Sequence, residues 1–369
     1  MHPLARWKLR GVKPYIPGKP IEELARELNL KGEIYKLASN ENPLGPSPMA
    51  VKAMEDALGE MNLYPDDMSY YLVKKLSKKI GVSPAEIILG NGSVEIMLMI
   101  ALAFVNPGES IVASDQSFIM YRIVGNIIGA VMIEPPLKDG KIDLEAILLS
   151  IRPDTKVIFI SNPNNPTGTA LFKEEVENFM KKVPEDVIVV WDEAYYEYMQ
   201  GKNFKETVSY VKRGWNCVIL RTFSKIYGLA GLRLGYGIAP KEIIDTLMRV
   251  RLPFNINRMA QIAAYHALDD EEHVRKSVEL VETEKKYLYR EFTKLGLKYL
   301  PTYTNFIFVD LGRDAAPAYE YLLKNGVIVR PLKNYNFPNA LRITIGTHQQ
   351  NVKLIELLNK FLKNTESGY

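Results

Sequence analysis

The stretch Thr222-Phe-Ser-Lys-Ile-Tyr-Gly-Leu-Ala-Gly-Leu-Arg-Leu-Gly-Tyr236 begins where the apolar run Cys217 to Arg221 gives way to irregular chain punctuated by glycines. The apolar run is typical of a buried strand, and open α/β sheets place their ligand chemistry at strand ends. A lysine surrounded by backbone and apolar groups loses solvation, which favours its neutral, nucleophilic amine. The stretch therefore predicts that Lys225 can form a Schiff base.

The same stretch carries groups that suit a phosphate. Thr222 and Ser224 offer hydroxyls, and Arg233 offers a guanidinium that matches phosphate oxygens in a bidentate fork. An amine beside a phosphate cradle is what an aldehyde cofactor with a phosphate ester needs, and pyridoxal phosphate is such a cofactor. The alternative is a strand end with a surface lysine and a structural arginine. This stretch alone favours neither interpretation.

The composition is that of an ordinary globular protein. The 369 residues are 47% hydrophobic and 24% charged, with a formal net charge of +4 and no long basic block. We expect no nucleic-acid partner. We also expect no membrane segment, because the most apolar run, residues 96–105, is about half of the roughly 20 residues that cross a bilayer. The N-terminus lacks a secretion signal and Cys217 is the single cysteine, so we predict a cytoplasmic protein and assign no metal site.

Short apolar runs alternate with helical patterns from residue 45 to residue 254. This alternation predicts a mostly parallel, doubly wound α/β sheet covered on both faces, forming a large domain. Residues 1–44 are rich in proline, glycine and asparagine, and predict an arm that wraps around the fold. Residues 255–369 show more helix among fewer strands, and predict a smaller α+β domain that the arm completes. The strands expected in the large domain are residues 86–89, 111–113, 131–133, 157–160, 187–190 and 218–220.

Two other strand ends carry polar turns. In Gly90-Asn-Gly-Ser-Val-Glu95, the backbone N–H groups of Gly92, Ser93 and Val94 can cradle a phosphate at a helix N-terminus. A simple strand-to-helix turn with a serine cap is the alternative, and taken alone it is the better one. Ser161-Asn-Pro-Asn-Asn-Pro-Thr-Gly168 predicts a rigid turn that presents the amide of Asn165 or Asn162 to a bound oxygen.

Asp192 stands just beyond the apolar run 187–190, with Trp191 between them. An ionised carboxylate there needs a positive partner, and none is adjacent in sequence. A protonated pyridine nitrogen would be such a partner, and Tyr195 could then donate to the 3-oxygen of the ring. The alternative is a helix-capping aspartate beside a packed tyrosine.

Phe118, Arg330 and Arg342 complete the candidates. Phe118 lies between a strand and a helix, where it can stack on a planar ring or simply join the core. Arg342 alternates with strand apolars, so it has either a solvated face or an anionic ligand, and Arg330 can join it. Spacing alone does not decide between these interpretations.

Taken together, these runs resemble the fold-type I pyridoxal-phosphate aminotransferases, and among them the histidinol-phosphate aminotransferases. The resemblance covers essentially the whole chain. The middle motifs are shared by many aminotransferases, whereas the Tyr-x-Pro-Gly-Lys-Pro run that starts at Tyr15 is the more specific pointer. The runs that carry it are residues 14–24, 37–43, 64–66, 90–93, 161–168, 192–195, 224–233 and 341–346.

The resemblance implies a role for each candidate. Lys225 would be the Schiff-base lysine, Asp192 would partner the pyridine nitrogen, Tyr195 and Asn165 would bind the 3-oxygen, and Phe118 would stack on the ring. The cofactor phosphate would be held by Gly92, Ser93, Val94, Thr222, Ser224 and Arg233, and by Tyr64 from a second subunit of a homodimer to which the N-terminal arm also contributes contacts. The substrate would be held by Arg342, Arg330 and Asn40, with Tyr15 of the partner subunit.

This chain departs from the family pattern at two positions. Val94 stands where the family usually has aspartate, but the contact there is largely through the backbone. Phe118 stands where tyrosine is frequent, which removes a hydroxyl and keeps the stacking ring.

By the same resemblance, the activity is ping-pong transamination between histidinol phosphate and 2-oxoglutarate in histidine biosynthesis. The sequence leaves open an aromatic amino acid aminotransferase and a decarboxylase of a phosphorylated amino acid on the same fold. A non-enzyme alternative is a regulatory module that binds pyridoxal phosphate. It is disfavoured because no DNA-binding segment or basic stripe accompanies the domain.

Overall fold

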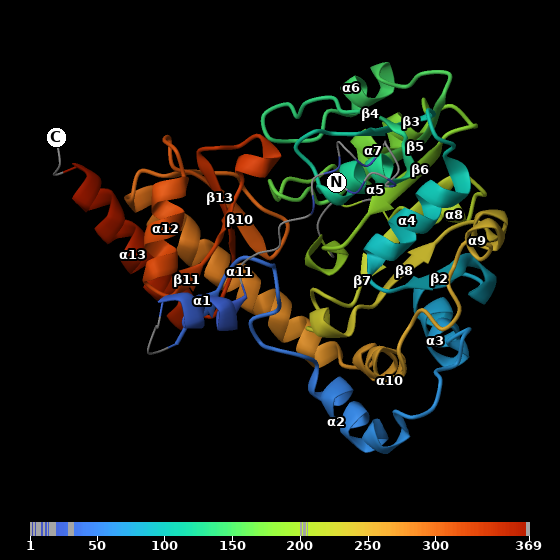
Figure 1. Ribbon diagram of the computed structural model, residues 1–369, viewed down its shortest axis with the longest axis horizontal. Coiled ribbons are helices and arrows are strands. Elements are labelled where there is room, and N and C mark those ends of the chain that lie inside the picture. Colours follow the sequence, from blue (N-terminus) through green and yellow to red (C-terminus); the bar gives the residue numbers. More distant parts are fainter. Residues whose placement is uncertain are drawn as a thin grey trace.

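The computed structural model describes residues 2, 4, 9, 12, 14, 20–28, 33–199, 201, 204 and 206–366. Its largest feature is a seven-stranded sheet with the order β2-β8-β7-β6-β5-β3-β4 (Figure 1). Neighbouring strands are parallel except at β8, which runs antiparallel to β2 and to β7. The expected mostly parallel sheet is confirmed. The strands are β2 (Ile87–Gly90), β3 (Ser110–Ala113), β4 (Val131–Ile133), β5 (Thr155–Ser161), β6 (Ile188–Asp192), β7 (Cys217–Thr222) and β8 (Gly235–Ile238).

Helices cover both faces of this sheet because alternate strand residues point to opposite sides. In β6, Ile188 and Val190 join one apolar cluster, whereas Val189 and Trp191 join another. The first cluster includes α4 (Ser93–Phe104), α5 (Met120–Ile128) and α9 (Lys241–Leu247). The second includes α2 (Pro48–Ala57), α3 (Tyr70–Ile80), α6 (Leu144–Leu149), α7 (Lys173–Met180), α8 (Val208–Val211) and α10 (Arg258–Ala267).

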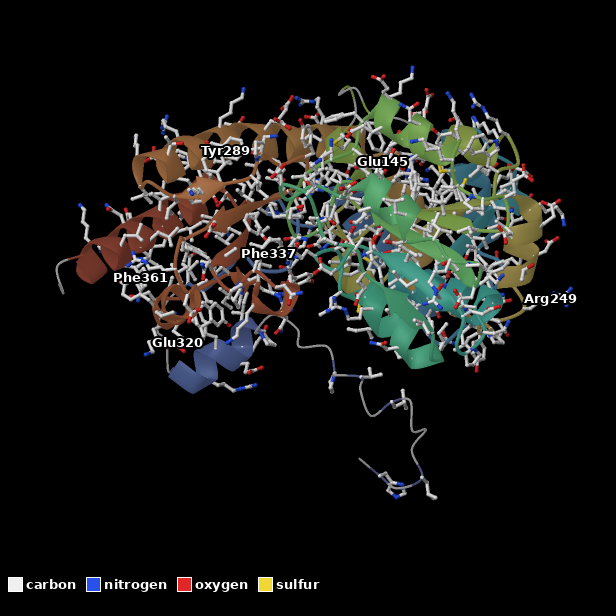
Figure 2. All side chains as sticks on the ribbon, turned by 90° about the horizontal axis from the view of Figure 1, so that it is seen from above. Glu145, Arg249, Tyr289, Glu320, Phe337 and Phe361 are labelled. Atoms are coloured by element: carbon white, nitrogen blue, oxygen red, sulfur yellow. The ribbon has the colours of Figure 1, made fainter. Side chains whose placement is uncertain are left out.

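The C-terminal elements form a second group beside this sheet. An antiparallel sheet has the order β12-β13-β10-β9 and is accompanied by three helices. Figure 2 shows the two groups side by side, with Tyr289 and Phe361 in one and Glu145 and Arg249 in the other. The elements are α11 (Glu271–Lys294), β9 (Lys298–Tyr299), β10 (Phe306–Asp310), α12 (Ala316–Lys324), β12 (Arg330–Pro331), β13 (Ala340–Thr344) and α13 (His348–Glu366).

The described part of the N-terminal region packs on the C-terminal group. The helix α1 (Ile21–Leu28) contributes Leu24 to a small apolar cluster with Ala38 and Ile328. Next to it, β1 (Tyr35–Lys36) pairs in parallel with β11 (Val327–Ile328). The chain then crosses from the C-terminal group to the large sheet through residues 37–47, which places this segment between the two groups.

One strand near the site departs from the sequence expectation. The strand β8 was not among the strands expected in the large domain. The run Gly235-Tyr-Gly-Ile238 has the glycine content of a loop, but it pairs on both sides as a central strand. Gly235 is required there because a Cβ would lie 2.4 Å from the backbone nitrogen of Ser93. The glycine therefore lets β8 approach the first turn of α4.

None of the helices in the described ranges is both long and apolar enough to cross a membrane.

Candidate active site

A pocket of about 280 Å³ lies at the carboxyl ends of β5, β6 and β7, where the C-terminal group meets the large sheet. Asp192 and Thr222 end β6 and β7, and Arg330 and Arg342 reach the pocket from β12 and β13. Parallel strands place their carboxyl ends along one edge, so residues far apart in sequence converge there. The predicted residues that line the pocket are Asn40, Gly92, Ser93, Val94, Phe118, Asn165, Asp192, Tyr195, Thr222, Ser224, Lys225, Arg233, Arg330 and Arg342.

Lys225 presents its amine to this pocket just beyond β7. Its Nζ donates a hydrogen bond to the carbonyl oxygen of Ser39 at 3.0 Å. Burial, followed by the positive charge of Arg342, lowers the pKa of Lys225 to about 8, although Glu41 and Asp192 oppose the shift. A substantial fraction of the amine is therefore neutral near physiological pH, which is the form that acts as a nucleophile or base.

The loop that carries Lys225 is fixed by a close backbone contact. Gly228 has a φ of +68°, and a Cβ at this position would lie 2.1 Å from the carbonyl oxygen of Gly45. The N–H of Gly228 donates to the carbonyl oxygen of Lys225 at 3.0 Å. A glycine is needed on both counts, because an L side chain disfavours this φ and would clash with the backbone. The position of Lys225 thus depends on the segment around Gly45.

One end of the pocket is built to hold an anion. Gly92, with a φ of +74°, precedes the first turn of α4, whose backbone N–H groups and dipole favour negative charge. The Nη1 of Arg233 donates to the Ser224 hydroxyl at 3.4 Å and to the Ala230 carbonyl at 3.1 Å. A Cβ on Gly92 would lie 2.5 Å from Arg233 Nη2, so only a glycine lets the guanidinium approach the helix end. With Thr222, these groups fit a phosphate ester.

Asp192 is a buried carboxylate with two hydrogen-bond donors. The Tyr121 hydroxyl donates to its Oδ2 at 2.8 Å, and the backbone N–H of Ala194 donates to its Oδ1 at 3.2 Å. Burial raises the pKa of Asp192 to about 6, and the two hydrogen bonds act in the opposite direction. Asp192 is therefore mostly ionised at neutral pH and would be stabilised by a cationic group in the pocket. Tyr121 was not among the residues predicted from sequence, where it reads as helix core.

Hydrogen bonds connect the large-sheet side of the pocket with the side formed by residues 37–47 and the C-terminal group. They involve Tyr195, Asn40 and Asn165. The Tyr195 hydroxyl accepts a hydrogen bond from Asn40 Nδ2 at 2.8 Å. Burial raises the pKa of Tyr195 to about 12, although Arg342 opposes the shift, so this hydroxyl keeps its proton. Asn165 accepts from Arg342 Nη1 at 2.6 Å. It lies in the predicted rigid turn, which has cis peptide bonds at Asn162-Pro163 and Asn165-Pro166.

Two buried arginines give the far end of the pocket a positive charge. Arg330 and Arg342 are 8% and 6% exposed and lie opposite each other on β12 and β13. Arg342 Nη2 also donates to the Ala38 carbonyl at 2.5 Å. Arg330 begins β12, just after β11 ends at Ile328. Two guanidinium groups in register give this end of the pocket a positive charge that suits an anionic ligand.

The remaining candidates lie differently. Phe118 is partly buried and lines the pocket. Tyr64 is 80% exposed, contacts the ring of Phe254 at 4.8 Å and does not line the pocket of its own chain. Tyr15 lies outside the described residues. Seven lining residues were not predicted, and Glu41 and Tyr335 are the two among them with titratable side chains. Of these two, only Glu41 had a signal in the sequence, since it belongs to the motif at residues 37–43.

Comparison with known proteins is consistent with this geometry. The family model for class I and II aminotransferases matches residues 32–358. A histidinol-phosphate aminotransferase of Moorella thermoacetica is 48% identical over 361 residues, covering 98% of this chain and 93% of that protein. One of Caldicellulosiruptor saccharolyticus is 46% identical over 354 residues, covering 96% and 99%. The solved structure of the Sinorhizobium meliloti histidinol-phosphate aminotransferase in complex with pyridoxal-5′-phosphate superposes with a TM-score of 0.90 at 26% identity, covering 99% of each chain.

Proposed function

The chain belongs to the class I and II aminotransferases, and we propose that it transfers an amino group from histidinol phosphate to 2-oxoglutarate, giving imidazole acetol phosphate and glutamate in histidine biosynthesis. One observation carries this proposal. The amine of Lys225, the buried carboxylate of Asp192 and the opposed pair Arg330 and Arg342 all line a single pocket. An amine and a carboxylate serve the cofactor, and two arginines at the other end serve an anionic substrate.

The cofactor in this proposal is pyridoxal 5′-phosphate. Its phosphate fits the anion-holding end, where the backbone N–H groups of Gly92, Ser93 and Val94 meet the side chains of Thr222, Ser224 and Arg233. When bound, the cofactor supplies an aldehyde that condenses with amines and a protonated ring that accepts the electron pair left on the substrate carbon. Phe118 would cover one face of that ring.

Lys225 has two tasks in this reaction. Its neutral amine would hold the cofactor until the amino donor takes that place. The free Nζ would then act as the base for the proton on the substrate carbon that bears the amino group, and afterwards as the acid that gives this proton back. The lowered pKa, about 8, suits this work, because a general base is most effective when its pKa lies near the working pH. Acid–base help of this kind contributes about 10²–10⁴-fold.

Three side chains would hold the ring. Asp192 would accept a hydrogen bond from the protonated ring nitrogen. That nitrogen would give this buried carboxylate a positive partner, and its own strand β6 contains none. Tyr195 would donate its retained proton to the 3-oxygen. Asn165 would add its Nδ2 group there, since its Oδ1 already accepts from Arg342.

Arg330 and Arg342 would bind the anionic end of each substrate in turn. Histidinol phosphate offers a phosphate and no carboxylate, whereas 2-oxoglutarate offers carboxylates, and guanidinium forks match both. Asn40 lines the same pocket and donates to the Tyr195 hydroxyl. Tyr15 of the partner subunit remains a proposed contact.

The working form in this proposal is a homodimer. Tyr64 would reach the cofactor phosphate of the partner subunit, and its exposure supports a role outside its own chain. Several exposed apolar side chains lie near it in the sequence, and Phe254 contacts its ring, as expected of a surface that another subunit covers. These exposed residues are Leu58, Met61, Leu63, Tyr64, Met68, Tyr70 and Tyr71, with Leu252 and Phe254.

We also propose the three-part division of the chain into residues 1–44, 45–254 and 255–369, and a cytoplasmic location. The large sheet uses strands from Ile87 to Ile238, and the antiparallel sheet uses strands from Lys298 to Thr344, which supports the second boundary. The single, buried Cys217 suits a reducing compartment.

A half-reaction screen tests the proposed substrate. The purified protein is loaded with pyridoxal phosphate, and its visible absorbance is followed after adding histidinol phosphate, phenylalanine, tyrosine or threonine phosphate without an oxo acid. We expect rapid loss of the absorbance with histidinol phosphate and its recovery on adding 2-oxoglutarate.

The other outcomes identify the alternatives. A response to phenylalanine without one to histidinol phosphate would assign an aromatic aminotransferase. Release of carbon dioxide from threonine phosphate would assign a decarboxylase. A coloured protein that responds to no donor would favour a regulatory module.

A further inference from the structure

Tyr121 touches the carboxylate of Asp192 from inside the protein. Its hydroxyl lies 2.8 Å from Asp192 Oδ2, and both side chains are buried. Tyr121 belongs to α5, whereas Asp192 ends β6, so the bond joins two elements that are far apart in sequence. We propose that Tyr121 is a positioning residue that keeps Asp192 ionised and oriented toward the ring nitrogen of the cofactor, an inference that rests on the proposed function.

The direction of the hydrogen bond is fixed. Burial, together with the nearby charge of Asp192, raises the pKa of Tyr121 well above its ordinary value, so the phenol keeps its proton. A protonated phenol donates, and the carboxylate accepts. Because the acceptor is charged, this bond is stronger than one between neutral groups, and it stabilises the ionised form of Asp192 against burial.

The ring of Tyr121 is held so that its hydroxyl cannot turn away. It stacks on Phe159 of β5, with centroids 4.9 Å apart and planes 5° apart. It also meets Phe118 edge-on at 5.7 Å, and its backbone N–H donates to the Phe118 carbonyl at 3.1 Å. The residue assigned to the ring face and the residue that orients Asp192 therefore lie three positions apart on one turn of chain.

The two oxygens of Asp192 are used evenly. The Tyr121 hydroxyl donates to Oδ2 and the N–H of Ala194 donates to Oδ1, and these two bonds fix the plane of the carboxylate. A carboxylate can accept about four hydrogen bonds, so acceptor capacity remains for a ring N–H. The charged and titratable groups around Asp192 are Glu193, which disfavours its ionisation, Lys225, which favours it, and the tyrosines Tyr121 and Tyr195.

The variant Tyr121→Phe removes this one hydroxyl and keeps the stacked ring. We expect the dissociation constant of pyridoxal phosphate to rise about tenfold, the effect of losing one pKa unit of charge stabilisation. With ¹⁵N-labelled cofactor, the ring-nitrogen resonance should move from the protonated position toward the neutral one. The value of kcat should fall while KM changes little, and the acidic limb of the kcat profile should move to higher pH.

Two controls separate positioning from general packing. Tyr210→Phe removes a hydroxyl from another buried tyrosine, in α8 on the opposite face of the sheet, and should leave cofactor affinity and the ¹⁵N resonance unchanged. In an Asp192→Asn background, Tyr121→Phe should change cofactor affinity by less than about twofold, because a residue that acts through Asp192 has no further effect once the charge is gone.

The outcomes are distinguishable. An unchanged ring-nitrogen resonance and affinity in Tyr121→Phe, with wild type loaded normally, would overturn this inference and leave the proposed function standing. An equal effect of Tyr121→Phe in both backgrounds would reduce Tyr121 to a packing residue. A wild-type protein that binds no pyridoxal phosphate would overturn the proposed function and this inference together.

Discussion

Arg330 and Arg342 lie directly opposite each other on the antiparallel strands β12 and β13, and both guanidinium groups are buried at the edge of the candidate active site. Like charges in register on neighbouring strands repel, and burial strengthens the repulsion. Arg342 is also held by Asn165 and by the carbonyl of Ala38, so it cannot swing out to solvent without breaking those contacts. This arrangement supports the proposal that the pair binds the anionic group of a substrate.

This pairing predicts the effect of Arg342→Lys on both half-reactions. Lysine keeps the charge but loses the bidentate fork, so KM for histidinol phosphate and KM for 2-oxoglutarate should both rise, by about 10- to 100-fold. Steady-state kinetics with each substrate varied would measure this. The matched variant Arg330→Lys should act in the same direction. If KM rose for only one of the two substrates, the proposal that both substrates share this anion site would be wrong.

The close contact at Gly228 predicts a stability difference between two glycines in the Lys225 loop. Gly228→Ala would place a Cβ 2.1 Å from the Gly45 carbonyl at a φ of +68°, so the free energy of unfolding should fall by about 2 kcal/mol or more. At Gly231 an added Cβ meets nothing within 4 Å, so Gly231→Ala should change the free energy of unfolding by about 0.5 kcal/mol or less. Denaturant unfolding of the two variants decides this, and equal effects would contradict it.

The exposed Tyr64 predicts complementation between subunits. Lys225→Ala and Tyr64→Ala proteins should each be defective at limiting cofactor. After unfolding and refolding together in equal amounts, hybrid dimers would have one site with both native residues, so about a quarter of the wild-type sites should return. Transaminase activity of the mixture measures this. A mixture no more active than the mean of its two components would show that Tyr64 does not serve the partner's site.

The lowered pKa of Lys225 predicts a pH-dependent stability in cofactor-free protein. Between pH 8 and about 10.5 the unfolded chain holds the proton and the folded chain does not, so stability gained from this residue rises with pH. At pH 7 the buried charge disfavours folding, and Lys225→Met should be more stable than wild type by roughly 2 kcal/mol, a value reduced for partial exposure. The unfolding free energies of wild type and Lys225→Met, measured from pH 7 to pH 10, should approach each other as the pH rises. A constant difference would contradict the shift.

Most of the candidate residues converge on one pocket because strand ends can be recognised from local sequence. Apolar runs such as Ile188 to Val190 indicate buried strands. The polar residues that follow such runs, for example Asp192, meet at one edge of a parallel sheet. Helix ends also carry local signals in the sequence: Ser47 caps α2 by accepting from the N–H of Ala50, and Gly81 follows α3 in the left-handed region.

What the sequence did not show depends on contacts between distant segments. The strand β8 is rich in glycine because it packs against the start of α4, and nothing in its own composition indicates a strand. Arg330 falls opposite Arg342 only through the pairing of β12 with β13. Tyr121 looks like any aromatic residue of an amphipathic helix, and only the fold brings its hydroxyl to Asp192. The three-part division of the chain stays a prediction.

Lys225 is the proposed point of attachment of the cofactor, and chemical trapping locates that point on the chain. Borohydride reduction of the protein loaded with pyridoxal phosphate fixes the cofactor to the amine that holds it, and mass spectrometry of the digested protein locates the mark. We predict that Lys225 alone is marked and that Lys225→Ala is folded, unmarked and inactive. A mark on another lysine, or near-normal transamination by Lys225→Ala, would contradict the account.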